Sequence, residues 1–453
     1  MSEIRSNYAL PSITPAEQAG DRIIHRLQEA GCLAYRVGGS VRDRLIGRIP
    51  REVDVATDAP PSRVRELFTS TYAVGEQFGV IIVHGDDGVD VEVATFREEH
   101  GYADGRHPAH VRYSTPGKDA RRRDFTVNAL FYDPLRHEIR DFVNGLEDLR
   151  RGVIRAIGDP FERFSEDRLR LLRAVRFAAG LGFELEKDTH AAIARLAHTV
   201  GTVSAERAAE EFNKMLTGPA PAGAFDLLRR LGLLDCWLPE LSAQAGVPQP
   251  PQFHPEGDVW AHTCLALSRA PCAIPELMWS VLLHDIGKPP THVYADGRDR
   301  FPSHANHGAA LTGEILIRLR MSRRFTDTVA HCVRNHMRFM HVRDMRRSTL
   351  RRLLGDPTFP LQLELHRVDC AASHGDFTNY WFLLDAVAEM AAEPPVPEPL
   401  VRGTDIMALG VREGPEVGTL LRMVQEWQLE GEVSSKEEAL IRVLEYMRKT
   451  GTT

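Results

Sequence analysis

Two carboxylate pairs, each with one residue between its members, mark the N-terminal part of this 453-residue sequence as a place for metal-dependent chemistry. Glu52 and Asp54 form the first pair, and Asp90 and Glu92 form the second. Side chains two positions apart in a strand point to one face, where they can share a divalent metal ion. The pattern favours two-metal phosphoryl or nucleotidyl transfer, although a solvated strand face is the commoner explanation of a single pair.

A glycine turn precedes the first pair. Gly38, Gly39 and Ser40 follow a short apolar run and come before a helical one. Backbone amides at such a turn can bind a triphosphate. Because a Gly-Gly turn is most often only a turn, the interpretation depends on the nearby carboxylates.

A second polar group recurs every three positions and consists of Asp167, Arg170, Arg173 and Arg176. At this spacing, consecutive members adjoin on one helix face while apolar residues keep to another. Asp accepts and Arg donates hydrogen bonds, so the group can pair with the Watson–Crick edge of a base and with phosphates. The alternative is an exposed helix face stabilised by salt bridges.

A third group contains histidines. His284 and Asp285 are adjacent at the end of an apolar helical run, and His262 lies upstream. Imidazole together with carboxylate suits a divalent transition metal better than calcium. Any single His is more often a core or surface residue, so the adjacent His-Asp pair is the stronger signal.

The elements that must position these groups change along the chain. Residues from about 20 to 160 mix β-like runs, a helical stretch and Gly turns, whereas helical periodicity without strands begins near Phe161. Proline-rich breaks follow at Gly246–Asp258 and Glu393–Pro399. The sequence therefore predicts an α+β fold with an N-terminal mixed sheet and helical parts after it.

Composition excludes several classes of protein. Hydrophobic residues make up 43% and charged residues 26%, which is ordinary for globular domains. No apolar run reaches the roughly 18 residues of a membrane span, and the six scattered cysteines form no C-x-x-C pair. We therefore expect a cytoplasmic protein with reduced thiols. The net charge of −7 does not exclude RNA, because 56 basic residues can form local patches.

Five motifs in order resemble the class II tRNA nucleotidyltransferase and poly(A) polymerase family. They are VGGSVRDRLIG, EVDVATDA, EVATFR, RRDFTVNAL and SEDRLRLLRAVRF. The resemblance implies that Glu52 and Asp54 are catalytic and hold Mg²⁺, and the second carboxylate pair adds Glu92 as a catalytic residue. It also implies nucleotide binding by Gly39, Arg42 and Arg123 and base reading by Asp167 and Arg170, with CTP and ATP as substrates and tRNA as partner. The glycine turn adds Gly38 to the nucleotide-binding residues, and the three-residue repeat adds Arg173 and Arg176.

One residue departs from the family pattern, which normally has Asp-x-Asp where this chain has Glu52-Val53-Asp54. Glu is one methylene longer than Asp and still binds Mg²⁺, but near-octahedral coordination tolerates misplacement poorly. We expect the substitution to affect metal affinity and reaction rate, whereas the resemblance to the family is unchanged.

The histidines resemble the ligands of the HD phosphohydrolase superfamily, which hold one or two metals. The implied ligands are His262, His284, Asp285, His304, His336 and Asp369. His307 and His331 are alternatives to His304, and a retained but inactive HD fold is the alternative to a metal site. The metal would be a divalent transition metal of unknown identity.

Together the two resemblances imply four parts. They are a nucleotidyltransferase head at 20–160, a helical neck at 161–245, an HD domain at 255–375 and a helical tail at 400–450. The tail, with DIMALG and GPEVGTLL, resembles CCA-adding enzymes with an HD domain, whereas poly(A) polymerases of the family tend to end in a basic extension.

The expected function is addition of CCA, or part of it, to tRNA 3′ ends, together with HD phosphohydrolase activity. The alternatives are a poly(A) polymerase and an RNA-binding HD phosphohydrolase with a decayed transferase site. Oligomeric state and the HD substrate stay open.

Overall fold

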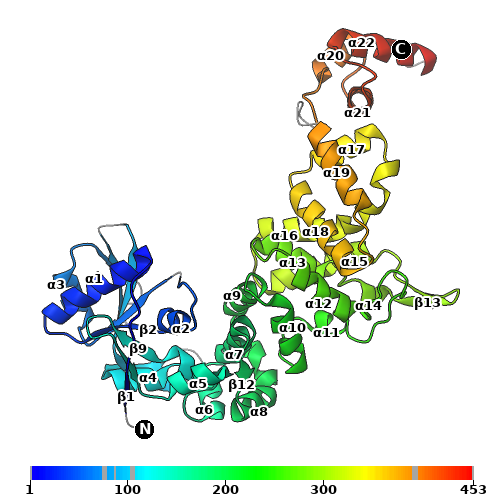
Figure 1. Cartoon of the computed structure of the whole chain (residues 1–453). Coiled ribbons are helices and arrows are strands. Elements are labelled where there is room, and N and C mark those ends of the chain that lie inside the picture. The colour runs from blue at the N-terminus through cyan, green and yellow to red at the C-terminus, as the bar shows by residue number, and fades with distance from the viewer. Residues whose placement is uncertain are drawn as a thin grey trace. The chain divides into compact units, whose positions relative to one another are not determined.

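The computed structural model describes residues 3–50, 52–73, 79–85, 88–102, 108–389 and 396–450. Its coordinates divide into two compact units, Met1–Ser242 and Ala243–Thr453. In Figure 1 the first unit runs from blue to green and the second from green to red.

An eight-stranded mixed sheet organises the first unit. Of its described strand pairings, the one between β3 and β6 is parallel and the others are antiparallel. The strand order is β1 (Ile4–Asn7), β10 (Glu138–Asp141), β9 (Leu130–Asp133), β2 (Ala34–Val37), β3 (Asp54–Thr57), β6 (Asp90–Thr95), β5 (Val80–His84) and β4 (Thr71–Ala73).

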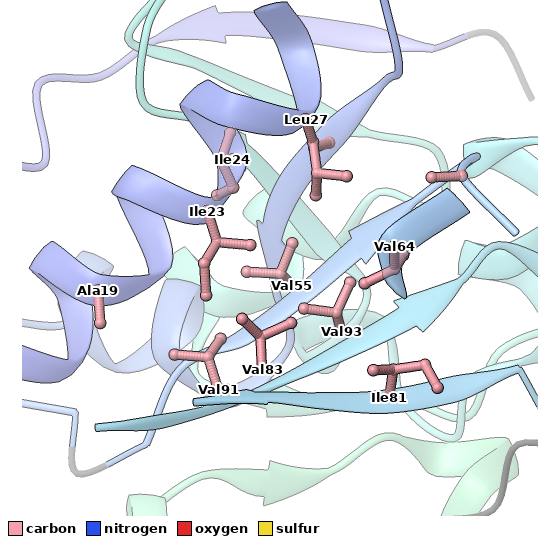
Figure 2. Close-up of a cluster of buried hydrophobic side chains, with 12 residues drawn as sticks. Ala19, Ile23, Ile24, Leu27, Val55, Val64, Ile81, Val83, Val91 and Val93 are labelled. Carbon is pink, nitrogen blue, oxygen red and sulfur yellow. The ribbon is translucent and has the colours of Figure 1, made fainter. Parts of the chain in front are cut away.

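Helix α1 (Pro15–Glu29) covers one face of this sheet. Its Ile23, Ile24 and Leu27 pack against valines of β3, β5 and β6, as Figure 2 shows. Gly20 lets the helix come close, because a Cβ there would lie 2.7 Å from Cγ1 of Val53. Val53 stands between Glu52 and Asp54, so this packing fixes the segment that bears both carboxylates.

The opposite sheet face has its own aromatic core, built from Tyr35, Phe96 and Phe131. Helices α2 (Gly39–Leu45), α3 (Pro61–Leu67), α4 (Pro116–Arg122) and α5 (Gly145–Arg151) complete the sheet-containing part, with the hairpin of β7 (Arg97–Tyr102) and β8 (Pro108–Tyr113).

Helices form the rest of the first unit, with one short parallel pair, β11 (Val153–Ile154) and β12 (Glu184–Leu185). They are α6 (Pro160–Glu166), α7 (Leu169–Leu181), α8 (Lys187–Leu196), α9 (Ala205–Leu216), α10 (Pro221–Arg230) and α11 (Pro239–Ser242). Leu172 and Val175 of α7 are fully buried, which confirms the apolar face predicted for this helix.

In its described residues, the second unit has helices and one hairpin, formed by β13 (Val293–Ala295) and β14 (Arg298–Arg300). Its first helices are α12 (Val259–Arg269), α13 (Pro275–Leu283), α14 (Lys288–Thr291), α15 (His304–Arg318), α16 (Arg323–Asn335) and η4 (His336–Asp344). They are followed by α17 (Arg347–Leu354), α18 (Phe359–Ala372), α19 (Thr378–Glu389), α20 (Gly403–Ala408), α21 (Pro415–Glu430) and α22 (Lys436–Thr450).

A close approach joins α15 to the turn between α13 and α14. A Cβ at Gly287 would lie 2.1 Å from the carbonyl oxygen of His304, so glycine is needed there for the start of α15 to sit beside the turn that carries His284 and Asp285. The tail helices have a separate core and are tied to α17 by Glu426, which accepts a hydrogen bond from Ser348.

The architecture confirms the α+β prediction, with helices interrupted only by short strand pairs after the sheet in the described residues. The finer four-part division stays a prediction, and part of the break at Glu393–Pro399 lies outside the described residues. Among the helices that the structure describes, none has both the length and the apolar character needed to cross a bilayer. All six cysteines are free thiols.

Candidate functional sites

The predicted catalytic carboxylates meet at the sheet. The parallel register of β3 and β6 places Asp54 opposite Glu92. Val53 and Val55 are buried whereas Glu52, Asp54 and Glu92 are exposed, so the three carboxylates share the face opposite α1. Asp90, at the start of β6, instead pairs with His84, its Oδ1 lying 2.7 Å from Nδ1.

These carboxylates crowd one another electrostatically. Partial burial and the charges of Glu92 and Glu52 raise the pKa of Asp54 to about 6, against the opposing effect of Arg123. A divalent cation among them would relieve the repulsion, and carboxylate oxygens are the ligands that Mg²⁺ takes in proteins. The donor set therefore fits the metal that the sequence implied.

The glycine turn lies directly beside Asp54. Gly38 has φ of +73°, and a Cβ there would lie 3.4 Å from Nη1 of Arg123 and 3.8 Å from Oδ2 of Asp54. A side chain would thus fill the space between turn, arginine and carboxylate. Ser40 closes the turn by donating a hydrogen bond to the carbonyl oxygen of Val37 at 3.1 Å.

A hydrogen-bonded chain links this turn to α7. Arg42 of α2 donates to Oδ1 of Asn128 at 2.5 Å, and Asn128 donates to Asp124 at 3.2 Å. Asp124 then pairs with Arg173 of α7, with Nη2 and Oδ2 2.7 Å apart. Burial alone would raise the pKa of Asp124, but Arg173 holds it at about 2.

The face predicted for Asp167 and the three arginines is only partly correct. Arg170, Arg173 and Arg176 lie on α7, but Asp167 precedes the helix in an extended conformation, with φ of −144°. This happens because α6 ends at Glu166 and a new helix begins two residues after Asp167.

Asp167 and Arg170 have different partners. Asp167 pairs with Arg207 of α9, with Nη2 and Oδ2 2.8 Å apart. The guanidinium of Arg170 donates instead to Glu166 at 2.6 Å. Arg176 pairs with Glu211 of α9 at 2.6 Å, so each of these arginines already has a carboxylate partner.

Phe177 is a further residue at this junction that the sequence reasoning missed. Three guanidiniums lie over its ring, those of Arg176 at 4.1 Å, Arg42 at 5.1 Å and Arg173 at 5.2 Å from the centroid. Phe177 is the last residue of the motif SEDRLRLLRAVRF, so its place in the motif could have indicated a role. Arg207 lies outside all five motifs, and nothing in the sequence indicated its role.

A pocket of about 430 Å³ brings the turn, the carboxylate and the arginines together. This volume falls in the range of small-molecule sites. The predicted residues on its wall are Gly38, Gly39, Arg42, Asp54, Arg123, Asp167, Arg170 and Arg173. Arg176 lines a smaller neighbouring pocket beyond Phe177.

In the second unit, the implied HD ligands converge from several helices and from the turn after α13. They form two trios, and within each trio the ligand atoms lie within 4.8 Å of one another. The trios are His262, His284 and Asp369, and Asp285, His304 and His336. Nε2 of His284 and Oδ2 of Asp285 are 3.3 Å apart, which joins the two groups into one cluster.

The histidine rings are oriented for ligation. Nδ1 of His284, His304 and His336 faces the carbonyl oxygens of Val281, Phe301 and Val333, respectively, at 2.8, 3.0 and 2.6 Å. Each ring thereby turns Nε2 toward the cluster, which is the arrangement of histidines that bind metals. The two alternatives to His304 do not join the cluster, because His307 is exposed and His331 pairs with Asp356.

Burial and neighbouring groups shift the pKa values of the histidines in this cluster in opposite directions. Burial would lower the pKa of His262, yet hydrogen bonds to Asp369 and Glu256 raise it to about 9. Burial and the charge of His284 lower the pKa of His336 to about 4. Such a buried mixture of imidazole and carboxylate donors fits a divalent transition metal. It opens on a pocket of about 680 Å³.

Three family models match the chain in the order of its parts. A poly(A) polymerase head domain matches residues 34–155, and an HD domain matches residues 261–369. Between them, the model described as "Probable RNA and SrmB- binding site of polymerase A" matches residues 182–244. The chain belongs to the tRNA nucleotidyltransferase and poly(A) polymerase family.

Curated relatives of the family agree with this assignment. The CCA-adding enzyme of Leuconostoc mesenteroides is 44% identical over 211 residues, which are 46% of this chain and 52% of that enzyme. The CCA-adding enzyme of Geobacillus kaustophilus is 42% identical over 261 residues, 56% of this chain and 63% of that enzyme. The chain thus spans about half to two thirds of the length of these relatives.

Solved structures of the family share the fold over nearly the whole chain. The Bacillus stearothermophilus CCA-adding enzyme in complex with CTP has a TM-score of 0.75 and 28% identity, with 97% of this chain and 100% of that chain covered. A Thermotoga maritima CCA-adding enzyme, complexed with tRNA, has a TM-score of 0.59 at 18% identity and supports the fold alone, covering 98% of this chain and 99% of that chain.

Proposed function

We propose that this chain is a tRNA nucleotidyltransferase that adds CCA, or part of it, to tRNA 3′ ends from CTP and ATP. The observation that carries the proposal is the pocket of about 430 Å³, where one space is lined by a glycine turn, Asp54 and the arginines of α7. Transfer of a nucleotide needs these three parts together, because the turn would bind the phosphates, Asp54 the metal and the arginines the base. The curated relatives named CCA-adding enzyme support the choice of product.

In this proposal Glu52 and Asp54 hold Mg²⁺ and Glu92 completes the acidic face. The bound metal would activate the attacking 3′-hydroxyl and stabilise the leaving pyrophosphate. The amides of Gly38 and Gly39, with Arg42 and Arg123, would bind the triphosphate. Arg170 and Arg173 would contact the base and the phosphates of the nucleotide from α7, with Asp167 as the acceptor, and Arg176 would do so only from the neighbouring pocket beyond Phe177.

Base selection provides the first prediction. Asp167→Ala removes the proposed acceptor and also leaves Arg207 without its partner. A good bidentate contact contributes about 1 to 3 kcal/mol of discrimination, so the preference for CTP and ATP over GTP and UTP should fall by roughly one to two decades. Incorporation of each of the four nucleotides is the measurement.

The control is Asp188→Ala, an exposed aspartate at the start of α8. It should leave the four-nucleotide profile unchanged. If Asp167→Ala has the same profile as the control, Asp167 only ties α9 to the break before α7, and the base-reading role is wrong.

Glu52 provides the second prediction. Glu52→Asp restores the residue usual in the family and needs only a small shift of the metal, so incorporation should stay at or above the parental rate. The comparison is with Glu52→Ala, which should be strongly impaired. A Glu52→Asp rate as low as that of Glu52→Ala would mean that the site is built around the longer side chain.

A poly(A) polymerase is the alternative within the same chemistry. The tail at 400–450 carries more acidic than basic residues, which is unlike the basic extension of such polymerases. The test supplies Mg²⁺ with either CTP or ATP and compares a tRNA lacking its 3′ terminus with an unrelated RNA. We expect CTP incorporation into tRNA alone, whereas elongation of any RNA with ATP alone favours the polymerase.

A metal-dependent phosphohydrolase activity in the HD domain is the second proposed function. Its supporting observation is the cluster of six ligands opening on the pocket of about 680 Å³. A divalent metal held there would polarise a phosphoryl oxygen and supply a nucleophile from water. Lys288, whose Nζ lies 2.7 Å from Oδ2 of Asp285, holds that carboxylate in its ionised form.

A further inference from the structure

The proline-rich segment Gly246–Asp258, which looks like a boundary in the sequence, is a closed loop. The amide of Gly246 donates to Oδ2 of Asp258 at 2.6 Å, and the amide of Val259 donates to the carbonyl oxygen of Val247 at 3.1 Å. Asp258 also caps α12 by accepting from the amide of Ala261 at 2.8 Å. The loop therefore ends at the helix that carries His262.

This loop contacts the HD cluster at two separate points. Oε1 of Glu256 lies 2.5 Å from Nδ1 of His262, on the side of the ring away from the cluster. Gln249 accepts a hydrogen bond at 2.6 Å from Lys288, which in turn pairs with Asp285. One member of each trio is thus held through the loop.

Glu256 is the hydrogen-bond partner of Nδ1 in His262, whereas backbone carbonyl groups take that place in the other three histidines. His284, His304 and His336 each direct Nδ1 to a carbonyl oxygen, whereas His262 directs it to a carboxylate. The Glu256 side chain is only 9% exposed, and Nδ1 of His254 lies 2.9 Å from the same oxygen. A buried carboxylate on Nδ1 fixes the ring and its tautomer and raises the basicity of Nε2.

We infer that Glu256 is a positioning residue of the metal centre, which orients His262 for ligation and makes the loop Gly246–Asp258 part of that centre. The inference rests on the proposed HD metal site and adds a residue that no motif indicated. Outer carboxylates of this type typically contribute 10- to 100-fold in metal affinity.

The test titrates the metal-free full chain with Co²⁺ and follows its visible absorption, which reports the coordination of the bound ion. Loss of the signal in His262→Ala assigns it to the HD cluster rather than to the carboxylate site. Glu256→Ala should bind Co²⁺ 10- to 100-fold more weakly than the parent. Glu256→Gln should lie between the two, because its amide oxygen still accepts from Nδ1 but carries no charge. Glu314→Ala, an exposed glutamate of α15, is the control and should bind as the parent does.

The outcomes separate this inference from the function on which it rests. If His262→Ala loses the Co²⁺ signal while Glu256→Ala binds within twofold of the parent, the metal centre stands and the role of Glu256 is wrong. If Glu256→Gln is as weak as Glu256→Ala, the hydrogen bond does not position the ring, and the inference is overturned. If the parent gives no signal that His262→Ala removes, the proposed metal centre and this inference both fail.

Discussion

We expect Asp54→Ala to abolish nucleotide incorporation while leaving the fold unchanged. Its carboxylate stands at the exposed start of β3, opposite Glu92, and lies outside both cores of the sheet. Removing it takes away a proposed metal ligand and a carboxylate whose pKa is raised by burial and by the charges of Glu92 and Glu52. The unfolding temperature of the variant should therefore equal or slightly exceed that of the parent. Incorporation of labelled CTP and ATP, with thermal unfolding on the same sample, is the measurement.

The matched control is Glu66→Ala, an exposed carboxylate of α3 in the same sheet domain. It should retain parental incorporation. If Asp54→Ala incorporates nucleotides at a rate within a factor of about two of the parent, nucleotide transfer does not take place at the sheet face that bears Asp54.

The second large effect concerns the HD cluster. Replacing His284 and Asp285 together by Ala leaves each trio with two ligands, because His284 belongs to one and Asp285 to the other. Bound transition metal should be lost, and with it hydrolysis of a phosphomonoester or of a 2′,3′-cyclic phosphate. Nucleotide addition should persist, because Glu52 and Asp54 lie in the other compact unit.

Two companions keep this result interpretable. Asp285→Ala leaves the buried Lys288 without its counter-charge, so His284→Ala alone tests metal loss while that ion pair is kept. His307→Ala, exposed on α15, should keep metal and both activities. Parallel loss of hydrolysis and incorporation in a folded double mutant would mean that the two sites are coupled and that this division is wrong.

The carboxylate site shows what periodicity can and cannot predict. Alternation placed Glu52 with Asp54 on one face, because that relation is local to the chain. The pairing of Asp54 with Glu92 depends on the parallel register of β3 and β6, which are separated in sequence and joined only by the topology of the sheet. Spacing could suggest two carboxylate pairs but could not show which members would meet.

The neck shows where periodicity misled. Repeats of three predicted one helix through Asp167 and Arg170, but the chain breaks between α6 and α7, so Asp167 turns to Arg207 of α9. That partner lies 40 residues away and no motif marked it. Long side chains choose partners by tertiary position, which a spacing rule along one helix does not contain.

The HD ligands were predicted as a set because their order along the chain resembles that of the HD phosphohydrolase superfamily, whereas any one of these histidines alone carries little signal. Glu256 was not predicted, since it lies in a loop whose prolines indicate only a helix break. Its role becomes visible through the contact with Nδ1 of His262. Loop residues that support a ligand carry no periodic signal.

The most direct test of the proposed function is the sequence of the product's 3′ ends. Purified protein with Mg²⁺, CTP and ATP would be incubated with tRNA transcripts ending before or after each terminal C, and the extended RNAs sequenced. The account predicts growth to CCA, or by the missing part of it, followed by a stop, and no growth with Asp54→Ala. Long adenosine tails, or tRNA left unextended by the parent protein, would contradict it.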